Sequence, residues 1–119
     1  MTRLSHLFVH VTSLDATRHF YVDLLGLEAL MDGDGYLRVG GGDGFHIGFE
    51  EREWADVGAP GVELAVRVDD VDEAYRRLRD GGVQVGLPPE DQEWGARHAW
   101  LYDPDGYRLS IFSPLEDAA

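Results

Sequence analysis

The chain has 119 residues, a length that suits one domain or two small modules and excludes a large multidomain enzyme. Its 23 Asp and Glu outnumber 10 Lys and Arg, giving a net charge of −13, so we expect no nucleic-acid partner. The chain has no cysteine, which excludes disulfides and thiolate chemistry, and no apolar run long enough for a membrane span or a signal peptide. We therefore expect no membrane partner and a cytoplasmic location.

The first half of the chain begins with a strand pattern and continues with a helical one. Residues 4–11 alternate between two faces, which is typical of a strand, and Thr12 or Ser13 can cap a following helix. The side chains that recur at helical spacing before the stop at Gly26 are Leu14, Thr17, Tyr21 and Leu24. A turn over 32–35, a strand over 36–39, a glycine-rich turn over 40–44 and a strand over 45–50 follow.

The second half repeats this order after a polar stretch over 51–60. A strand over 62–68 leads to a cap at Asp69 or Asp70 and a helix that ends at the glycine pair 81–82. One face of that helix carries Val71, Ala74, Tyr75 and Leu78. A strand near 83–86, a polar loop over 88–95, a strand over 98–102, an Asp-Pro-Asp-Gly turn over 103–106 and a strand over 107–112 complete the pattern.

The two halves can be overlaid on each other. Placing His6 on Glu63 also pairs Val9 with Val66, and the two Asp-Gly turns coincide near the ends of the halves. Chance similarity between strands and amphipathic helices is the alternative, but element order, helix stops and turns agree together. The sequence therefore predicts an α+β fold of two tandem β-α-β-β-β modules within a single domain over 1–119. Module one covers about 4–50, a linker about 51–60 and module two about 61–114.

Two segments carry a family resemblance. Residues 18–27 (RHFYVDLLGL) and 103–109 (DPDGYRL) resemble the vicinal oxygen chelate superfamily. That superfamily includes glyoxalase I, bleomycin-resistance proteins, fosfomycin-resistance enzymes and extradiol dioxygenases, and the resemblance covers about residues 4–114. It implies that the modules form a cupped, partly closed mixed sheet with helices outside, enclosing a ligand cavity. It also implies a homodimer in which two chains build the working pockets.

The resemblance further implies where metal-dependent members place His, Glu or Gln ligands. The four corresponding positions here are His6, Gly48, Glu63 and Ser110. Only His6 and Glu63 have suitable side chains, whereas a catalytic divalent site commonly needs about three protein ligands. We therefore expect no cofactor. In the alternative, an altered site built with His46, His98 or His10 would hold Zn, Fe, Mn or Ni, and Glu63 is the candidate general base if it is not a ligand.

Strand alternation, anchored on those four positions, predicts the other side chains that line the cavity. The expected ligand-binding residues are Phe8, His10, Tyr36, Arg38, His46, Glu50, Arg67, His98, Trp100, Arg108, Ser110 and Phe112, and Ala65 is expected to face the same way. Arg38 and Arg108 suit an anionic substrate, and the alternative is that they pair with Glu50 or Glu63.

Two functions follow, from different classes. The first is a small-molecule-binding protein of the glyoxalase and bleomycin-resistance type that confers antibiotic resistance by sequestering a cationic or aromatic compound. The net charge of −13 and the position of Trp54 and Trp94 within acidic segments favour it, with simple loop anchoring as the alternative role of the two tryptophans. The second is a metal-dependent lyase, isomerase or dioxygenase with an altered set of metal ligands.

Overall fold

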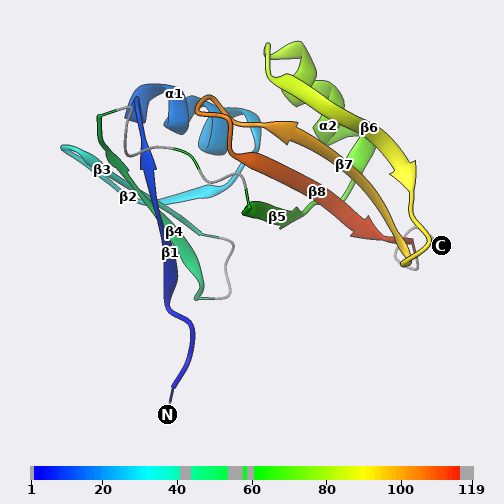
Figure 1. The fold of residues 1–119 in the computed structure, drawn as a ribbon, viewed down its shortest axis with the longest axis horizontal. Coiled ribbons are helices and arrows are strands. Elements are labelled where there is room, and N and C mark those ends of the chain that lie inside the picture. The colour runs from blue at the N-terminus through cyan, green and yellow to red at the C-terminus, as the bar shows by residue number, and fades with distance from the viewer. Residues whose placement is uncertain (1, 41–43, 54–57, 59–60, 116–119) are drawn as a thin grey trace. The chain divides into compact units, whose positions relative to one another are not determined.

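A computed structural model of the chain describes residues 2–40, 44–53, 58 and 61–115 (Figure 1). The chain divides into two compact units, Met1–Gly58 and Ala59–Ala119. Each unit contains one four-stranded mixed sheet and one helical region, in the order β-α-β-β-β. The predicted α+β fold of two tandem modules is therefore confirmed. Among the described residues, no helix combines the length and apolar character needed to cross a membrane.

The first unit places its helical region between its first two strands. Its elements are β1 (His6–Val11), α1 (Leu14–Arg18), the π-helical turn η1 (His19–Leu24), β2 (Glu28–Gly33), β3 (Tyr36–Gly40) and β4 (His46–Glu51). The strand order is β1-β4-β3-β2. Strand β1 runs parallel to β4, and the other pairs are antiparallel.

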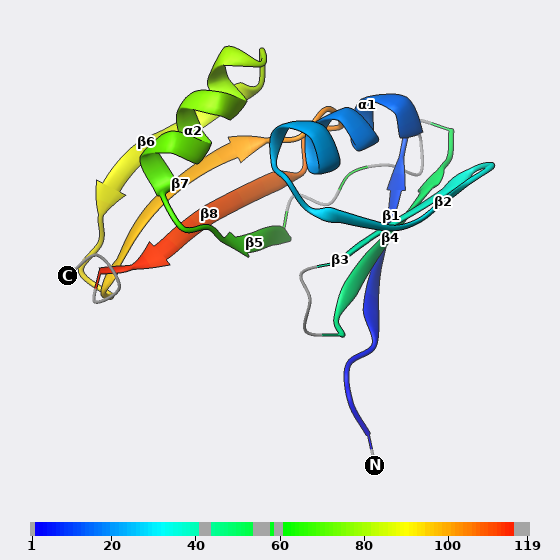
Figure 2. The same cartoon turned by 180° about the vertical axis from the view of Figure 1, so that it is seen from behind.

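The second unit repeats this topology. Its elements are β5 (Glu63–Arg67), α2 (Val71–Asp80), β6 (Gln84–Asp91), β7 (Ala96–Tyr102) and β8 (Arg108–Pro114). The strand order is β5-β8-β7-β6, again with a parallel first pair and antiparallel partners. Figure 2 shows α2 lying against one face of this sheet. The shared order and the shared parallel pair are what a duplicated module predicts.

The core of each unit lies between its helix and one face of its sheet. In the first unit the ring of Phe49 on β4 packs 4.7 Å from that of Tyr21 on η1, and both side chains are fully buried. In the second unit the buried helix residues are Val71, Ala74, Tyr75 and Leu78, as the helical spacing predicts. Because strand residues alternate, the opposite face of each sheet carries a separate set of side chains.

The first helical region differs from its prediction by one residue. The periodicity predicts that Leu24 faces the core, but Leu25 is buried and Leu24 is only half-buried. The cause is η1, in which the N–H of Leu25 donates to the carbonyl of Phe20, five residues earlier, at 2.9 Å. A π-helical turn inserts one residue relative to α-helical spacing, so it shifts the buried face by one position.

Two edge strands also differ from the sequence analysis. The sequence pattern predicts no strand at β2, because its six residues are all exposed and show no alternation between buried and exposed side chains. The polar loop predicted over 88–95 is wrong in its first half, because β6 continues through Pro88 and Pro89 to Asp91. An edge strand tolerates proline since one side of it has no ladder to complete.

The Asp-Pro-Asp-Gly turn is organised by its first residue. Asp103 is buried, and its Oδ1 accepts hydrogen bonds from the backbone N–H groups of Asp105 and Tyr107, each at 2.9 Å. Gly106 has a φ of 87°, which side-chain-bearing residues rarely adopt. The turn therefore directs the chain from β7 into β8 as its sequence predicts.

Arg97 on β7 ties the second helix to its sheet. Its guanidinium donates to both carboxylate oxygens of Asp72 on α2, at 2.7 and 2.8 Å, and to Asp91 on β6 at 3.0 Å. The hydrogen bonds from Arg97 hold the pKa of the Asp72 carboxyl below its ordinary value. This fork joins three elements of the second unit.

Candidate functional site

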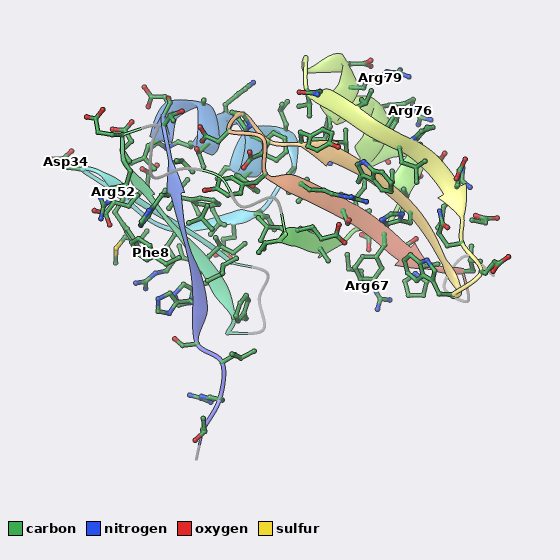
Figure 3. All side chains as sticks on the ribbon, viewed as in Figure 1. Phe8, Asp34, Arg52, Arg67, Arg76 and Arg79 are labelled. Carbon is green, nitrogen blue, oxygen red and sulfur yellow. The ribbon has the colours of Figure 1, made fainter. Side chains whose placement is uncertain are left out.

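Each sheet has one face turned away from its helix, and these faces carry the predicted site residues. The first-module face consists of His6, Phe8, His10, Tyr36, Arg38, His46, Gly48 and Glu50. The second-module face carries Glu63, Ala65, Arg67, His98, Trp100, Arg108, Ser110 and Phe112 on β5, β7 and β8, and Glu90 on β6, opposite His98. The strand registers thus place the residues of the predicted lining together, on the expected side of each sheet. Figure 3 shows this for Arg67, which projects from the side of the second sheet opposite Arg76 and Arg79 of α2.

An aromatic cluster occupies the middle of the first-module face. Phe8 lies beside Tyr36 and His10, with ring centroids 6.2 and 5.7 Å away, and is 43% exposed (Figure 3). Tyr36 lies across Gly48: a Cβ at position 48 would stand only 2.6 Å from the tyrosine hydroxyl oxygen. Position 48 therefore requires a glycine because the Tyr36 side chain occupies the space that a Cβ would need. In the sequence, this glycine stands out only as a missing metal ligand.

Arginine and glutamate on the first-module face do not pair as one alternative predicts. Arg38 donates from Nε to the Tyr36 hydroxyl at 3.3 Å, and its guanidinium lies 5.6 Å from the centre of that ring. Glu50 instead forms an ion pair with Arg52, which follows β4. The expected pairing of Arg38 with Glu50 is thus wrong, because Arg52 is two residues from Glu50 on the same side of the chain.

Two histidines stack at one end of the first-module face. His6 and His46 are register partners on β1 and β4, and their rings are almost parallel, with centroids 4.8 Å apart and planes 4° apart. The Ser5 hydroxyl lies 2.9 Å from His6 Nδ1.

Trp100 is the centre of the second-module face. The Arg108 guanidinium stacks over its indole ring, with Cζ 3.6 Å from the ring centroid. Arg108 Nε lies 3.0 Å from Glu63 Oε2, so the pairing of Arg108 with Glu63 that the sequence allowed is present. The far edge of the indole lies against Gly86 on β6, where a Cβ would stand 2.1 Å from both Cδ1 and Nε1. This stack is not predicted by strand alternation, and its only signal in the sequence is a glycine on the strand beside a tryptophan.

The aromatic ladder of the second-module face continues along β7 to the turn before it. His98 lies 5.9 Å from Trp100 and 5.5 Å from Trp94, measured between ring centroids. Trp94 is 63% exposed, so it does not belong to the core. Trp54 lies outside the described residues.

Several polar atoms of the second-module face are buried without a hydrogen-bond partner among the described residues. They are His98 Nδ1, Trp100 Nε1, Arg108 Nε and Ser110 Oγ. Arg108 Nε is close enough to Glu63 for an ion pair, but the direction of its N–H is not that of a hydrogen bond. Buried polar groups are normally satisfied, so four such atoms on one face indicate a surface completed by water or by a ligand.

The four positions that hold a metal in metal-dependent relatives do not fit one here. Tyr36 fills the space beside Gly48, and the Glu63 carboxylate is engaged by Arg108. Within the described part of the chain, no three His, Asp or Glu side chains gather closely enough to hold a metal ion. Of the altered-site candidates, His6, His10 and His46 belong to the first unit, and Glu63 and His98 to the second.

Comparison with known proteins identifies the family. A sequence profile of the Glyoxalase/Bleomycin resistance protein/Dioxygenase superfamily matches residues 3–111, so the chain belongs to this superfamily. It is 34% identical over 104 residues to a bleomycin resistance protein of Klebsiella pneumoniae, covering 82% of this chain and 81% of that protein. It is 28% identical over 121 residues to a probable lactoylglutathione lyase of Synechocystis sp., covering 91% and 92%.

A solved structure gives the same result. TnmS3, an antibiotic binding protein from Streptomyces sp. CB03234, superposes with a TM-score of 0.79 at 28% sequence identity, covering 96% of this chain and 97% of that chain. Both the fold and the family resemblance stated from residues 18–27 and 103–109 are therefore confirmed.

Proposed function

We propose that this protein binds a planar aromatic small molecule against its sheet faces and sequesters it without converting it. The observation that carries the proposal is the concentration of aromatic side chains on the faces away from the helices, where they do not serve the core. Phe8 and Trp94 stay 43% and 63% exposed. Exposed aromatic clusters beside hydrogen-bonding groups are typical of sites for ring-containing ligands.

The relatives support an antibiotic as the ligand class. One is a bleomycin resistance protein and another an antibiotic binding protein, and each matches more than four-fifths of this chain. Neither comparison defines the ligand of this chain, so the class is part of the proposal. We also propose a homodimer as the working unit, and light scattering coupled to size-exclusion chromatography tests it by the mass in solution.

The net charge of −13 favours a cationic ligand over a neutral one by long-range attraction. Such attraction is screened beyond about 8 Å at physiological ionic strength, so a cation steered by it binds more weakly as salt rises. An affinity that does not change with salt would instead indicate that ring stacking alone selects the ligand.

Binding is tested by calorimetric titration with bleomycin and with a set of planar polycyclic antibiotics. We expect saturable binding of at least one compound, weakened by Phe8→Ala or Trp94→Ala. Phe45→Ala is the matched control, because Phe45 is 41% exposed but precedes β4 at a position of the opposite parity. If no compound binds saturably, or if the control weakens binding as much as the two face variants do, the proposal is wrong.

The metal-dependent alternative is decided by elemental analysis of protein purified without chelator. The similarity to a probable lactoylglutathione lyase favours this alternative, whereas the engagement of Glu63 by Arg108 speaks against it. We expect metal far below one ion per chain. Near one transition-metal ion per chain, lost in both His6→Ala and Glu63→Ala, would replace the binding proposal by the enzymatic one.

A further inference from the structure

We propose that Arg108 is the group that recognises the ligand, and that it does so by binding an anionic oxygen, such as a carboxylate, attached to the ligand's ring system. The inference rests on the proposed function, because it names a chemical group on the molecule that the sheet faces bind. It specifies an anionic group on the ligand, which neither the fold nor the similarity to relatives indicates.

Arg108 is held in one orientation by two neighbours. Trp100 covers one face of its guanidinium at 3.6 Å, and Glu63 lies 3.0 Å from its Nε. A guanidinium fixed on both its face and its Nε edge loses little conformational freedom when it binds a further partner. The stack therefore presents an arginine that is already positioned.

The remaining edge of Arg108 is available for a ligand. Its side chain is 39% exposed, and neither Nη group donates to any residue that the structure describes. The two Nη groups form the end-on edge of the fork, which matches the two oxygens of a carboxylate. Glu63 approaches from the Nε side, so it does not occupy that edge.

Hydrogen bonding on the surrounding face is also incomplete. Ser110, two residues from Arg108 on β8, is buried, and its hydroxyl has no partner among the described residues; the same is true of Trp100 Nε1. A face that leaves these donors unmatched favours a ligand with oxygen acceptors over a hydrocarbon. Arg38 on the first-module face differs because its guanidinium lies 5.6 Å from the Tyr36 ring centre, whereas Arg108 is stacked at 3.6 Å from that of Trp100.

The acidity of the chain does not oppose this inference at short range. The second-module face carries Arg67 and Arg108 against Glu63 and Glu90, the register partner of His98, so its positive and negative charges balance and the excess of Asp and Glu lies elsewhere in the sequence. Distant carboxylates are screened over a Debye length, whereas a carboxylate on the Nη edge is in direct contact. Local contacts therefore decide the preference.

The test uses three probes that share one ring system and differ in charge: 2-naphthoate, 2-naphthamide and 2-naphthylmethylammonium. Affinities come from NMR titrations of the full chain, with the tryptophan indole N–H signals as the reporter. We expect naphthoate to bind at least about tenfold more tightly than naphthamide, as a charge-assisted pair requires. Arg108→Gln should reduce this ratio to below about threefold, and Arg108→Lys should keep part of it because it keeps the charge but not the fork.

Arg79→Gln is the matched control. Arg79 also lies over an aromatic ring, 5.9 Å from the centre of Tyr75, and also pairs with an acid, Asp80, but it sits on helix α2 (Figure 3). It should leave the naphthoate preference unchanged, and spectra of each variant establish that it is folded. Binding of the probes without a carboxylate preference, or a preference that survives in Arg108→Gln, overturns this inference alone. If none of the three probes binds saturably, binding of planar aromatic compounds fails, and this inference fails with it.

Discussion

Replacing Gly86 by alanine should destabilise the protein by displacing Trp100. A methyl group at this position would stand 2.1 Å from two atoms of the indole, whereas carbon atoms in good contact stay about 3.5 Å apart. The ring must therefore move by more than an ångström. Overpacking of this kind typically costs 1–3 kcal/mol, and a shifted ring also weakens its stack with Arg108, worth about 0.5–1 kcal/mol. Alanine also reduces the conformational entropy of the unfolded chain, which offsets about 0.5–1 kcal/mol of this cost. The net destabilisation is then about 2 kcal/mol.

A loss of this size lowers the melting temperature by roughly 8 °C in a chain of this length. It is measured by thermal and urea denaturation of the wild type, Gly86→Ala, Trp100→Ala and the double variant. The three atoms nearest to the added methyl all belong to Trp100, so removing this side chain should lower the cost of Gly86→Ala to a small fraction of its value in the wild-type background. Gly33→Ala is the control on the other edge strand, because no atom lies within 4 Å of a Cβ there, and it should change stability by less than about 0.5 kcal/mol. An equal cost of Gly86→Ala with and without Trp100 would refute this reasoning.

Three further predictions concern the contacts that hold each unit together. Asp72→Asn should cost up to about 1 kcal/mol at pH 7, because it breaks the fork with Arg97 on a partly exposed surface. Since the pKa of Asp72 is lowered from 3.8, this stabilisation is present above that pH and lost as the pH falls through the folded-state value, so the difference between wild type and variant in urea denaturation should shrink as the pH is lowered below 3.8. Glu51→Gln should cost about 1 kcal/mol by urea denaturation, because it keeps an acceptor oxygen but removes the charge that strengthens the hydrogen bond from the Leu14 N–H to Glu51 Oε1, 2.9 Å long, at the start of α1. Asp103→Ala should lower stability by about 2–3 kcal/mol in the same assay, since it removes the acceptor of two backbone hydrogen bonds.

Each of these has an outcome that contradicts it. A constant difference between wild type and Asp72→Asn from pH 7 to pH 2 would show that the carboxylate charge is not responsible. An unchanged stability of Glu51→Gln would mean that Ser13, whose side chain also caps this helix, suffices alone. If Asp103→Asn, which keeps an acceptor oxygen, cost as much as Asp103→Ala, hydrogen bonding in the turn would not be the cause.

Much of the fold could be predicted because the apolar residues of most elements recur at helical or strand spacing. Helix α2 begins at the cap Asp70 and buries the face that its spacing predicts. The elements that were not predicted lack a burial pattern or break one. Strand β2 is exposed throughout, β6 contains two prolines, and η1 adds one residue to a helical spacing. Edge strands and π-helical turns are stabilised by pairing and packing rather than by local pattern, so the sequence carries little trace of them.

In the candidate site, the sequence predicts on which face of the sheet a residue lies but not which residue it contacts. Strand parity places Tyr36, Arg38, Trp100 and Arg108 on the faces away from the helices, because alternation depends only on the order of residues. Which of them touch depends on side-chain conformation across strands. Arg38 therefore contacts Tyr36 rather than Glu50, and Arg108 covers Trp100. No spacing rule specifies such choices.

The duplicated sheet has a consequence for how binding specificity can change. At equivalent register positions, one module carries Phe8, Gly48 and Arg38, whereas the other carries Ala65, Ser110 and Trp100. The two halves thus share a scaffold but offer two chemically different walls. Each wall residue alternates along its strand with one that faces the helix, so it can be exchanged while the core beneath stays intact. A protein built in this way can gain or lose a ligand through single substitutions that leave the helix-facing core unchanged, at those positions where packing within the face itself, such as that of Trp100 against Gly86, is kept.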